Sequence, residues 1–315
     1  MRDVELRELR YFVAVATELN FSRAAERLGM AQSPLSKAIA QLESRLGARL
    51  LDRDTRRVEL TPAGAVLLEQ ARLVLDAADA AITRTVRAAR PEPRLTVTLK
   101  PGGDSDLLRR IIAAYSRPGL PAVDISFAGF GGPAGQLRSG AADVALLRSP
   151  FDTHGLEVWE LSSEPRVVAM TATHRFAGRT RLRRADLAGE PLPHWPGGDP
   201  ASNDYWHGRD PASRTSAWAE GGPGEPGPVG PTVGDLMQLL EVVAFGQAVA
   251  FVPASTAARY PRPDIAYIPV TDLSPSSTVI AWPEGSHSRA VAAFVTAAIE
   301  VAERHPAELA AGLAP

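Results

Sequence analysis

Residues 20–46 constrain the fold of this 315-residue chain most, because they combine two helical periodicities with residue types that begin and end helices. Ser22 is predicted to cap a first short helix and Gly29 to end it, since glycine readily adopts positive φ. Ser33 is predicted to cap a second helix with Pro34 at its first position, where the missing N–H removes no hydrogen bond. Two helices joined by so tight a turn predict a helix-turn-helix.

The second predicted helix has two unlike faces. Apolar side chains recur at helical spacing, and they make one buried stripe of Leu35, Ile39, Leu42 and Leu46. The opposite face carries only short or polar side chains: Gln32, Ser36, Lys37, Ala40 and Gln41. A thin polar helix can enter the major groove of DNA, whereas a bulky apolar helix cannot. We therefore predict that residues 33–46 form a recognition helix.

A hairpin and a long helix are predicted to follow. The charged tip DRDTRR is flanked by apolar residues, which is typical of a two-stranded wing. Arg53 and Arg56 at this tip would lie beside DNA phosphates, or alternatively the tip is only solvated. Thr61 and Pro62 then begin a helix that meets no breaker before residue 90 and is therefore roughly 40 Å long. Its narrow apolar stripe needs a partner, and a second copy of the helix would make a homodimer with two symmetric recognition helices.

From residue 95 onward, predicted strands alternate with predicted helices, which indicates a parallel or mixed α/β sheet. The strands are expected at 95–99, 123–129, 142–148, 166–170, 248–253, 266–270 and 277–283. The main helices are expected at 106–116, 133–139, 235–246 and 288–303. Strands that leave one subdomain and come back predict two lobes with a cleft: lobe I at about 91–161 and 268–315, and lobe II at about 162–267. Residues 219–231 hold five glycines and four prolines, and we expect a mobile surface loop there without a helix or strand.

Composition excludes several classes of protein. The chain has no cysteine and its six histidines are scattered, so we expect no disulfide and no metal site. We find no run of 18 apolar residues and no secretory leader, so we expect no membrane span and a cytoplasmic location. Residues 1–90 hold 15 Lys and Arg against 12 Asp and Glu, and the remainder is acidic, which fits one nucleic-acid-facing domain joined to another. The only lysines among the 34 basic residues are Lys37 and Lys100.

With these residues in place, the chain resembles the LysR-type transcriptional regulators. The resemblance is strongest over residues 5–75, through ELRYFVAVATELNFSRAAERLGMAQSPLSKAIAQLESRLGARLLDR and the LTPAG that opens the long helix. LRSGAADVALLRSP and VVAFGQAVAFVP look like the family's effector-binding domain, while residues 191–231 depart as a long insert. The resemblance implies a winged helix-turn-helix at 1–60, a linker helix at 61–90, and a two-lobed α/β effector-binding domain at 91–315 similar to periplasmic binding proteins. It also implies assembly into dimers and tetramers, and no cofactor.

The resemblance carries DNA contacts onto particular residues. Gln32, Pro34, Ser36 and Lys37 occupy positions where the recognition helix of such proteins meets the bases and phosphates of double-stranded DNA, and Gln41 lies on the same face. Ser22 and Ser33 would donate hydrogen bonds to phosphates in addition to their capping roles. Arg53 and Arg56 of the wing would add affinity that does not depend on sequence and that falls with salt.

A ligand site is expected where the strands of the α/β domain end. Lys100, Gly102, Gly103 and Asp104 form the turn between the first strand and its helix, where the helix N-terminus suits an anion. The alternative is an ordinary helix cap beside a surface lysine. Further candidates at other strand ends or helix starts are Phe130, Arg148, Trp195 and Thr232. Arg148 is the best candidate for an anion clamp, because it directly follows the buried run VALL.

We therefore expect a sequence-specific transcription factor whose cleft binds a small effector such as an organic anion. An enzyme is disfavoured, because the motifs G-x-S-x-G, G-x-x-x-x-G-K-[ST] and H-E-x-x-H are absent and no histidine pairs with a nucleophile. A solute-binding protein would match only the rear domain. A DNA-binding regulator with a vestigial, unliganded cleft is the remaining alternative.

Overall fold

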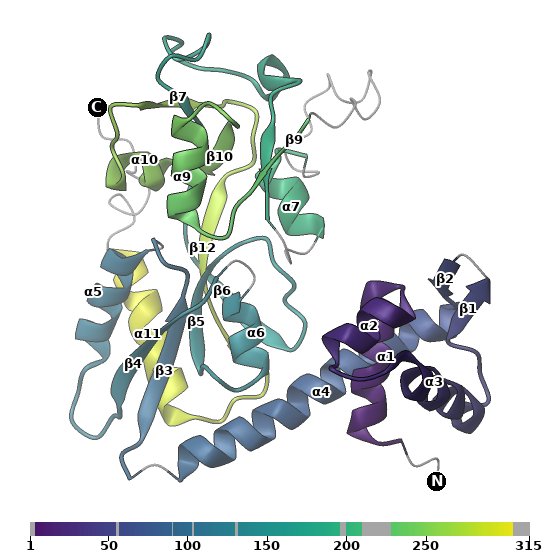
Figure 1. The fold of residues 1–315 in the computed structure, drawn as a ribbon. Coiled ribbons are helices and arrows are strands. Elements are labelled where there is room, and N and C mark those ends of the chain that lie inside the picture. The colour runs from purple at the N-terminus through teal and green to yellow at the C-terminus, as the bar shows by residue number, and fades with distance from the viewer. Residues whose placement is uncertain are drawn as a thin grey trace. The chain divides into compact units, whose positions relative to one another are not determined.

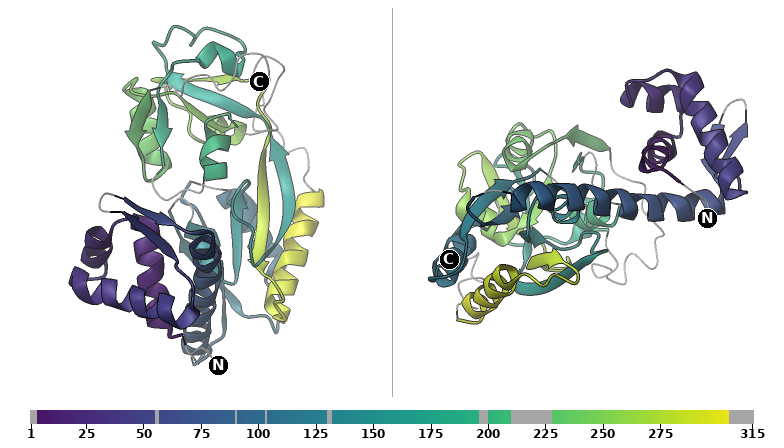
Figure 2. Two further views of the ribbon diagram at one scale, coloured as in Figure 1. Left: turned by 90° about the vertical axis from the view of Figure 1, so that its right-hand side faces the viewer. Right: turned by 90° about the horizontal axis from the view of Figure 1, so that it is seen from below.

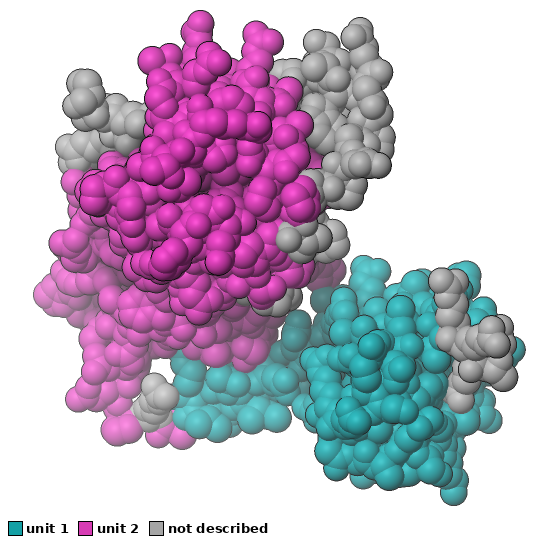
Figure 3. Space-filling view, turned by 45° about the horizontal axis from the view of Figure 1, so that its top comes forward, with its two compact units in different colours: residues 1–87 teal, residues 88–315 magenta. Residues whose placement is uncertain are grey.

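The computed structural model describes residues 4–54, 57–89, 91–102, 104–129, 132–195, 200–209 and 228–304. The chain divides into two compact units, residues 1–87 and residues 88–315 (Figure 3). Each unit has a hydrophobic core of its own.

The first unit is a helix-turn-helix followed by a wing and a long helix (Figure 1). Its elements are α1 (Leu6–Glu18), α2 (Phe21–Arg27), α3 (Gln32–Leu46), β1 (Leu51–Asp54), β2 (Arg57–Leu60) and α4 (Pro62–Ala88). The predicted apolar stripe of α3 is the centre of the core, where Leu35, Ile39 and Leu42 are fully buried. Each such side chain stabilises the fold by roughly 1.5–3 kcal/mol. The predicted winged helix-turn-helix is thus confirmed.

The predicted caps of both short helices are wrong. The N-cap of α2 is Asn20, whose side chain accepts a hydrogen bond from the amide of Arg23 at 3.0 Å, and Ser22 lies inside the first turn. The N-cap of α3 is Ala31, so Ser33 and Pro34 also lie inside the first turn. Proline is tolerated there because no N–H of the first turn has an intrahelical partner. Several polar residues in a row can each serve as a cap, and local sequence does not choose among them.

The wing and the long helix are fixed to the end of α3. The Glu43 carboxylate accepts hydrogen bonds from the amides of Leu50 and Leu51 at 2.8 and 3.1 Å, which holds the chain as it enters β1. The Thr61 hydroxyl accepts from the amide of Gly64 at 3.0 Å and thereby caps α4, as the sequence predicts. A Cβ atom on Gly64 would lie 2.0 Å from the carbonyl oxygen of Leu50, so only glycine permits this close approach.

The long helix α4 has 27 residues and carries an exposed apolar surface. It ends at Ala88, two residues before the predicted end, and residue 90 lies outside the described residues. Its exposed apolar side chains are Val66, Val74, Ile82 and Val86, which are between 46% and 64% exposed. A helix that leaves such side chains in water has a surface suited to a partner helix.

Lobe I of the second unit is a three-layer sandwich. Its elements are β3 (Arg94–Leu99), α5 (Ser105–Tyr115), β4 (Ala122–Phe127), α6 (Gly132–Arg138), β5 (Val144–Arg148), β6 (Leu156–Glu164), β12 (Ser276–Pro283) and α11 (Arg289–Arg304). The strands form a mixed sheet of order β4-β3-β5-β12-β6, in which β3 is parallel to β4 and β5 while β12 is antiparallel to its neighbours. Side chains alternate along β5, so that Val144 and Leu146 join the core with α5 and α11, whereas Ala145 and Leu147 join the core with α6. The ribbon has α5 and α11 on one face of the sheet and α6 on the other (Figure 1).

Lobe II is built on a smaller, antiparallel sheet. Its elements are β7 (Arg166–Thr171), the 3₁₀ turn η1 (Arg184–Leu187), β8 (Leu192–His194), α7 (Pro200–Trp206), β9 (Val229–Thr232), α9 (Leu236–Ala244), β10 (Ala250–Pro253), α10 (Ala254–Arg259) and β11 (Ile265–Pro269). The sheet order is β10-β7-β11, and both pairs are antiparallel. α9 packs on one face through Leu239 and Val243, and Leu182 and Leu187 pack on the other.

Two long strands connect the lobes. β6 and β12 pair antiparallel along their whole lengths, and Figure 2 shows them running from lobe I toward lobe II. Pro165 alone separates β6 from β7, and residues 270–275 lead from β11 back to β12. The chain therefore changes lobes a few residues later than the predicted boundaries at 161/162 and 267/268.

Three expectations about this unit are wrong. The strand β6 is absent from the predicted strands, because it is an edge strand whose first half is exposed on both faces and so lacks a clear apolar alternation. The sheet of lobe II is antiparallel, whereas the alternation of strands and helices predicted a parallel or mixed sheet. The Gly/Pro-rich segment ends in a strand, since Val229–Thr232 forms β9 and pairs with β8; residues 219–227 lie outside the described residues.

Candidate functional site

The first candidate site is the exposed face of α3. Gln32, Lys37 and Gln41 are exposed on this face, while the helix buries its opposite stripe in the core. Ser33 and Pro34 are exposed in its first turn, and Ser36 is half-buried. The face therefore combines a long cation with amide and hydroxyl groups, which are the side chains that hydrogen-bond to base edges and phosphates.

The two helices of the motif are linked at this face by their side chains. The hydroxyl of Ser22 on α2 donates to the Oε1 atom of Gln32 on α3 at 3.1 Å. This bond uses the carbonyl oxygen of the Gln32 side chain and leaves its amide nitrogen as the donor. Ser22 therefore contacts a predicted DNA-binding residue and takes no part in capping.

The wing is only partly described. Arg53 lies in β1, which pairs with β2 from Leu51↔Leu60 to Asp54↔Arg57. Arg56 lies outside the described residues. The predicted phosphate contacts of the wing therefore stay predictions.

The second candidate site is a cavity of about 140 Å³ between the two lobes. The parallel strands β3 and β5 end at this cavity, which is lined by Leu99 at the end of β3, by Lys100 directly after it, and by Arg148 at the end of β5. Lobe II contributes Trp195 and Trp206, together with the start of α9 and the end of β10. A cavity at the carboxyl ends of parallel strands, between two lobes, is where α/β proteins hold ligands.

Most of the predicted effector residues meet at this cavity. Its lining includes Lys100, Gly102, Asp104, Arg148 and Trp195. Thr232 is exposed at the end of β9 and is not part of the lining. Gly103 and Phe130 lie outside the described residues.

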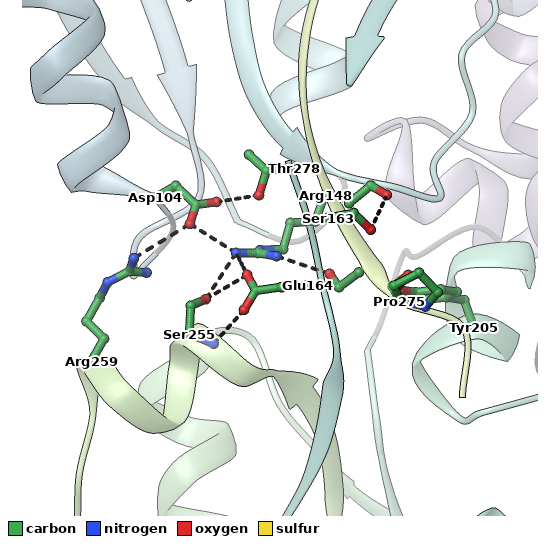
Figure 4. A network of polar contacts seen from close by, with 11 residues as sticks. Asp104, Arg148, Ser163, Glu164, Tyr205, Ser255, Arg259, Pro275 and Thr278 are labelled. Atoms are coloured by element: carbon green, nitrogen blue, oxygen red, sulfur yellow. Dashed lines mark hydrogen bonds and ion pairs between the residues drawn. The ribbon is translucent and has the colours of Figure 1, made fainter. Parts of the chain in front are cut away.

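Arg148 is held by a network of polar groups from both lobes (Figure 4). Its Nη2 atom lies 3.0 Å from Asp104 Oδ1 and 2.7 Å from Glu164 Oε1, and all three side chains are mostly buried. The same nitrogen donates to the Ser255 hydroxyl of lobe II at 3.2 Å, and Nη1 donates to the Ser276 hydroxyl at 3.1 Å. Arg148 therefore lies at the cavity as predicted, but two carboxylates already compensate its charge.

Asp104 and Glu164 are held in place by further contacts. Asp104 is the N-cap residue of α5, yet its carboxylate caps no amide; it accepts from the Thr278 hydroxyl at 2.9 Å and lies 3.6 Å from the guanidinium of Arg259. The Glu164 carboxylate accepts from both the amide and the hydroxyl of Ser255. Because Ser255 and Arg259 belong to α10, these contacts tie lobe I to lobe II.

Lys100 has a different environment. It directly follows β3 and lines the cavity, and burial lowers the pKa of its ammonium from 10.5 to about 8. Desolvation of the charged form is the cause. The side chain therefore changes its protonation near physiological pH.

Several residues of the cavity and its network are absent from the predicted site. Trp206, Leu236 and Phe251 line the cavity from lobe II, and Glu164 and Ser255 complete the network. An aromatic residue such as Trp206 serves packing or ligand contact equally well, and the sequence around it does not distinguish the two. Glu164 is the last residue of β6, a strand that the sequence pattern did not predict, so no local signal marks it.

The described residues also lack two kinds of feature. No helix among the described residues is long and apolar enough to cross a membrane. In the same part of the chain, no cluster of three or more His, Asp or Glu side chains is arranged to hold a metal ion.

Comparison with known families gives two matches that together span nearly the whole chain. Residues 6–65 match the family described as bacterial regulatory helix-turn-helix protein, lysR family. Residues 88–303 match the family described as LysR substrate binding domain. The first match ends just inside α4, and the second covers both lobes.

Individual relatives agree with these matches. The chain is 29% identical to the Hca operon transcriptional activator HcaR of Escherichia coli over 93% of this chain and 96% of that protein. It is 36% identical to the transcriptional regulator AlsR of Bacillus subtilis over 60% of this chain and 63% of that protein. Among solved structures, full-length BenM has 26% identity and a TM-score of 0.52 over 96% of this chain and 97% of that one. Full-length CbnR in complex with its target DNA has 27% identity and a TM-score of 0.51 over 95% and 100%.

Proposed function

The chain belongs to the LysR family of bacterial helix-turn-helix regulators, and we propose that it couples a small molecule bound in the interlobe cavity to operator binding by α3. It is a DNA-binding transcriptional regulator with an effector-binding domain. The observation that supports the DNA half of the proposal is the face of α3, which exposes Gln32, Lys37 and Gln41 while its opposite stripe is buried. CbnR, which has a similar structure, has been crystallised with its target DNA.

The regulator is proposed to act as a dimer through α4, residues 61–90 being its linker. The exposed valines and isoleucine of α4 would be buried against the same helix of a second copy. A two-fold axis would then present two α3 helices to two half-sites of a palindrome. Dimers of this kind would pair further into a tetramer. Because the proposed target is chromosomal DNA, we also propose that the protein is located in the cytoplasm.

The effector half of the proposal rests on the cavity and on the contacts that cross it. Beside the cavity, Asp104 of lobe I contacts Arg259 of lobe II, and Arg148 of lobe I contacts Ser255 of lobe II. A molecule bound there would change the balance between lobe arrangements. A ligand shifts such an equilibrium only by its difference in affinity for the two arrangements. The relatives HcaR and AlsR are transcriptional regulators, which supports a regulatory role without a catalysed reaction.

Selection from a random DNA library tests the proposal. The purified full-length protein should enrich a two-fold symmetric sequence whose half-sites lie about one helical turn of DNA, or a multiple of it, apart. Selection with the Lys37→Ala variant should enrich this sequence less strongly. If the wild-type protein enriches no sequence relative to the starting library, the proposed sequence-specific function is contradicted.

A further inference from the structure

A fully buried arginine stands where the chain enters lobe II. Arg166 is the first residue of β7, follows Pro165 directly, and is only 1% exposed. Its Nε and Nη2 atoms donate to the carbonyl oxygen and the hydroxyl of Ser274 at 2.7 and 2.8 Å, and Nη1 donates to the carbonyl oxygen of Tyr205. Its guanidinium carbon also lies 3.8 Å from the centre of the Tyr205 ring. Burial of a cation is costly unless it is hydrogen-bonded, so these contacts hold the side chain firmly in one place.

The Arg166 side chain connects the two crossings between the lobes. Pro165 makes the first crossing, and Ser274 belongs to the second, which leads from β11 back to β12. The β6–β12 ladder ends with the pair Glu164↔Ser276, and the guanidinium joins the two segments again just beyond that pair. Because a guanidinium is a planar fork with fixed donor directions, Ser274 cannot shift relative to β7 without breaking charged hydrogen bonds.

The same side chain also connects the crossings to the wall of the cavity. Tyr205 and Trp206 are the last two residues of α7. The Tyr205 hydroxyl donates to the carbonyl oxygen of Pro275 at 2.7 Å, and the two residues lie side by side in Figure 4. The ring of Trp206 packs against that of Tyr205 in an edge-on contact with the centroids 5.0 Å apart, and Trp206 lines the cavity. A continuous series of contacts therefore runs from the second crossing through Arg166 and Tyr205 to the cavity wall.

We infer that Arg166 is a positioning residue, which couples the place of Trp206 in the cavity wall to the arrangement of the two lobes. Contiguous side-chain contacts between rigid elements carry coupling of this kind. Here α7 and the crossing at Ser274 move as one body, because both accept hydrogen bonds from a single guanidinium. A change that displaces Trp206 therefore displaces the crossing, and with it one lobe relative to the other. The inference rests on the proposed function in taking this cavity as the effector site, whereas the coupling itself requires no ligand.

A purely structural role for Arg166 leads to a different expectation. Loss of the side chain would then lower the stability of lobe II, and a change at Trp206 would leave the distance between the lobes as it is. Tyr267 offers a matched comparison, because its hydroxyl donates to the carbonyl oxygen of Tyr260 at 3.0 Å, a contact within lobe II alone. Tyr205→Phe and Tyr267→Phe each remove one such hydroxyl and keep the ring, and only Tyr205→Phe removes a contact to a crossing.

Distances between spin labels on the two lobes test the inference in the full-length protein. The chain has no cysteine, so cysteines introduced at the exposed Thr296 of α11 and the exposed Thr180 of lobe II are the only labelling sites. Dilution with unlabelled protein restricts double electron–electron resonance to distances within one chain. Tyr205→Phe should broaden the distance distribution at least about twofold, because the crossing gains freedom to move. Tyr267→Phe should leave the width unchanged.

A cycle of substitutions measures the coupling itself. Trp206→Ala removes part of the cavity wall, so α7 can relax toward the cavity and should change the mean distance between the labels by about 2 Å. In the Arg166→Met background the same substitution should change that mean by less than about half as much, since α7 no longer shares a donor with the crossing. If Arg166→Met fails to fold, Tyr205→Phe serves as the background for the same cycle.

The outcomes separate the inference from the proposed function. A Tyr205→Phe distribution as narrow as that of wild type, or a Trp206→Ala change that is equal in both backgrounds, would overturn the coupling and leave Arg166 a structural role only. Neither measurement uses a ligand or DNA, so neither result tests the effector site. A broad metabolite screen in which no compound binds would overturn the effector half of the proposed function and leave the coupling of α7 to the lobes intact.

Discussion

Gly102 of lobe I and Leu236 of lobe II approach so closely that a Cβ atom on Gly102 would lie 2.8 Å from the Cδ2 atom of Leu236. Gly102 also has a φ of +75°, a conformation that other residues rarely adopt, and the same Cβ would lie 3.0 Å from the Tyr260 hydroxyl. Both Gly102 and Leu236 line the cavity. The turn after β3 therefore sets how closely the lobes approach at the cavity.

Gly102→Ala is expected to alter the cavity, and Gly119→Ala provides the matched control. Both glycines have positive φ, so both variants should lose about 1 kcal/mol or more of stability. A Cβ atom added at Gly119 has no atom within 4 Å, so Gly119→Ala should lower stability only through its strained backbone. Only Gly102→Ala should also weaken the binding of a ligand in the cavity, as measured by calorimetry. Equal ligand affinity in the two variants would show that the close approach has no role in the site.

Arg148→Ala is expected to destabilise the second unit strongly. The substitution leaves the mostly buried carboxylates of Asp104 and Glu164 without their shared guanidinium. Breaking a buried ion pair in this way lowers the free energy of unfolding by about 3–5 kcal/mol. Urea unfolding followed by fluorescence measures the loss, with Arg181→Ala at an exposed site as the control. A loss below about 1 kcal/mol would mean that the network contributes little to the fold.

The stability of the protein should depend on pH through Lys100. The pKa of its ammonium is about 8 in the folded protein and 10.5 when the side chain is exposed to water, so the unfolded chain binds more protons between these values. Stability therefore rises with pH from about 8 to about 10.5, by up to about 3 kcal/mol. Lys100→Met removes this dependence, so it should be more stable than wild type at pH 7 and lose that advantage by pH 10.5. Urea titrations at several pH values check the sign, and a constant difference would refute the assignment.

Lys37→Ala should weaken binding to the selected operator by about 1–3 kcal/mol if the ammonium contacts a base. Binding to random DNA should then change little. Fluorescence anisotropy on both DNAs measures the two affinities, and Arg289→Ala removes a charge from an exposed site on the second unit as a control. Equal losses on both DNAs would instead identify a phosphate contact.

Ile82→Asp should disrupt the proposed dimer. The isoleucine is 61% exposed on α4, and burying a carboxylate against its symmetry mate is unfavourable by about 1–3 kcal/mol or more. Sedimentation equilibrium should show weaker self-association than for wild type. Gln70→Asp introduces the same charge at an exposed polar position of the same helix and should have a smaller effect. A dimer that tolerates Ile82→Asp would have to be held by another surface.

The sequence predicted most of the long helices and buried strands in their order, together with the buried faces of the helices, but it missed the edge strand β6. The spacing of Leu35, Ile39 and Leu42 predicts both the recognition helix and its polar side, because helical periodicity is a local property of the chain. The glycine, proline and hydroxyl residues locate the turns to within a few residues. The choice between Ser22 and Asn20 as cap was not predictable, since it depends on which backbone conformation the rest of the motif imposes.

The tertiary structure alone decided the charge balance at the interlobe cavity. Sequence placed Lys100 and Arg148 at strand ends, and Arg148 looked like the better anion clamp. The fold brings Glu164 and Asp104 onto Arg148 from 16 and 44 residues away, and Ser255 onto it from 107. These neighbours compensate Arg148, while burial at the end of β3 lowers the pKa of Lys100. Electrostatic roles depend on distances between segments that are remote in the chain, and a local pattern does not contain those distances.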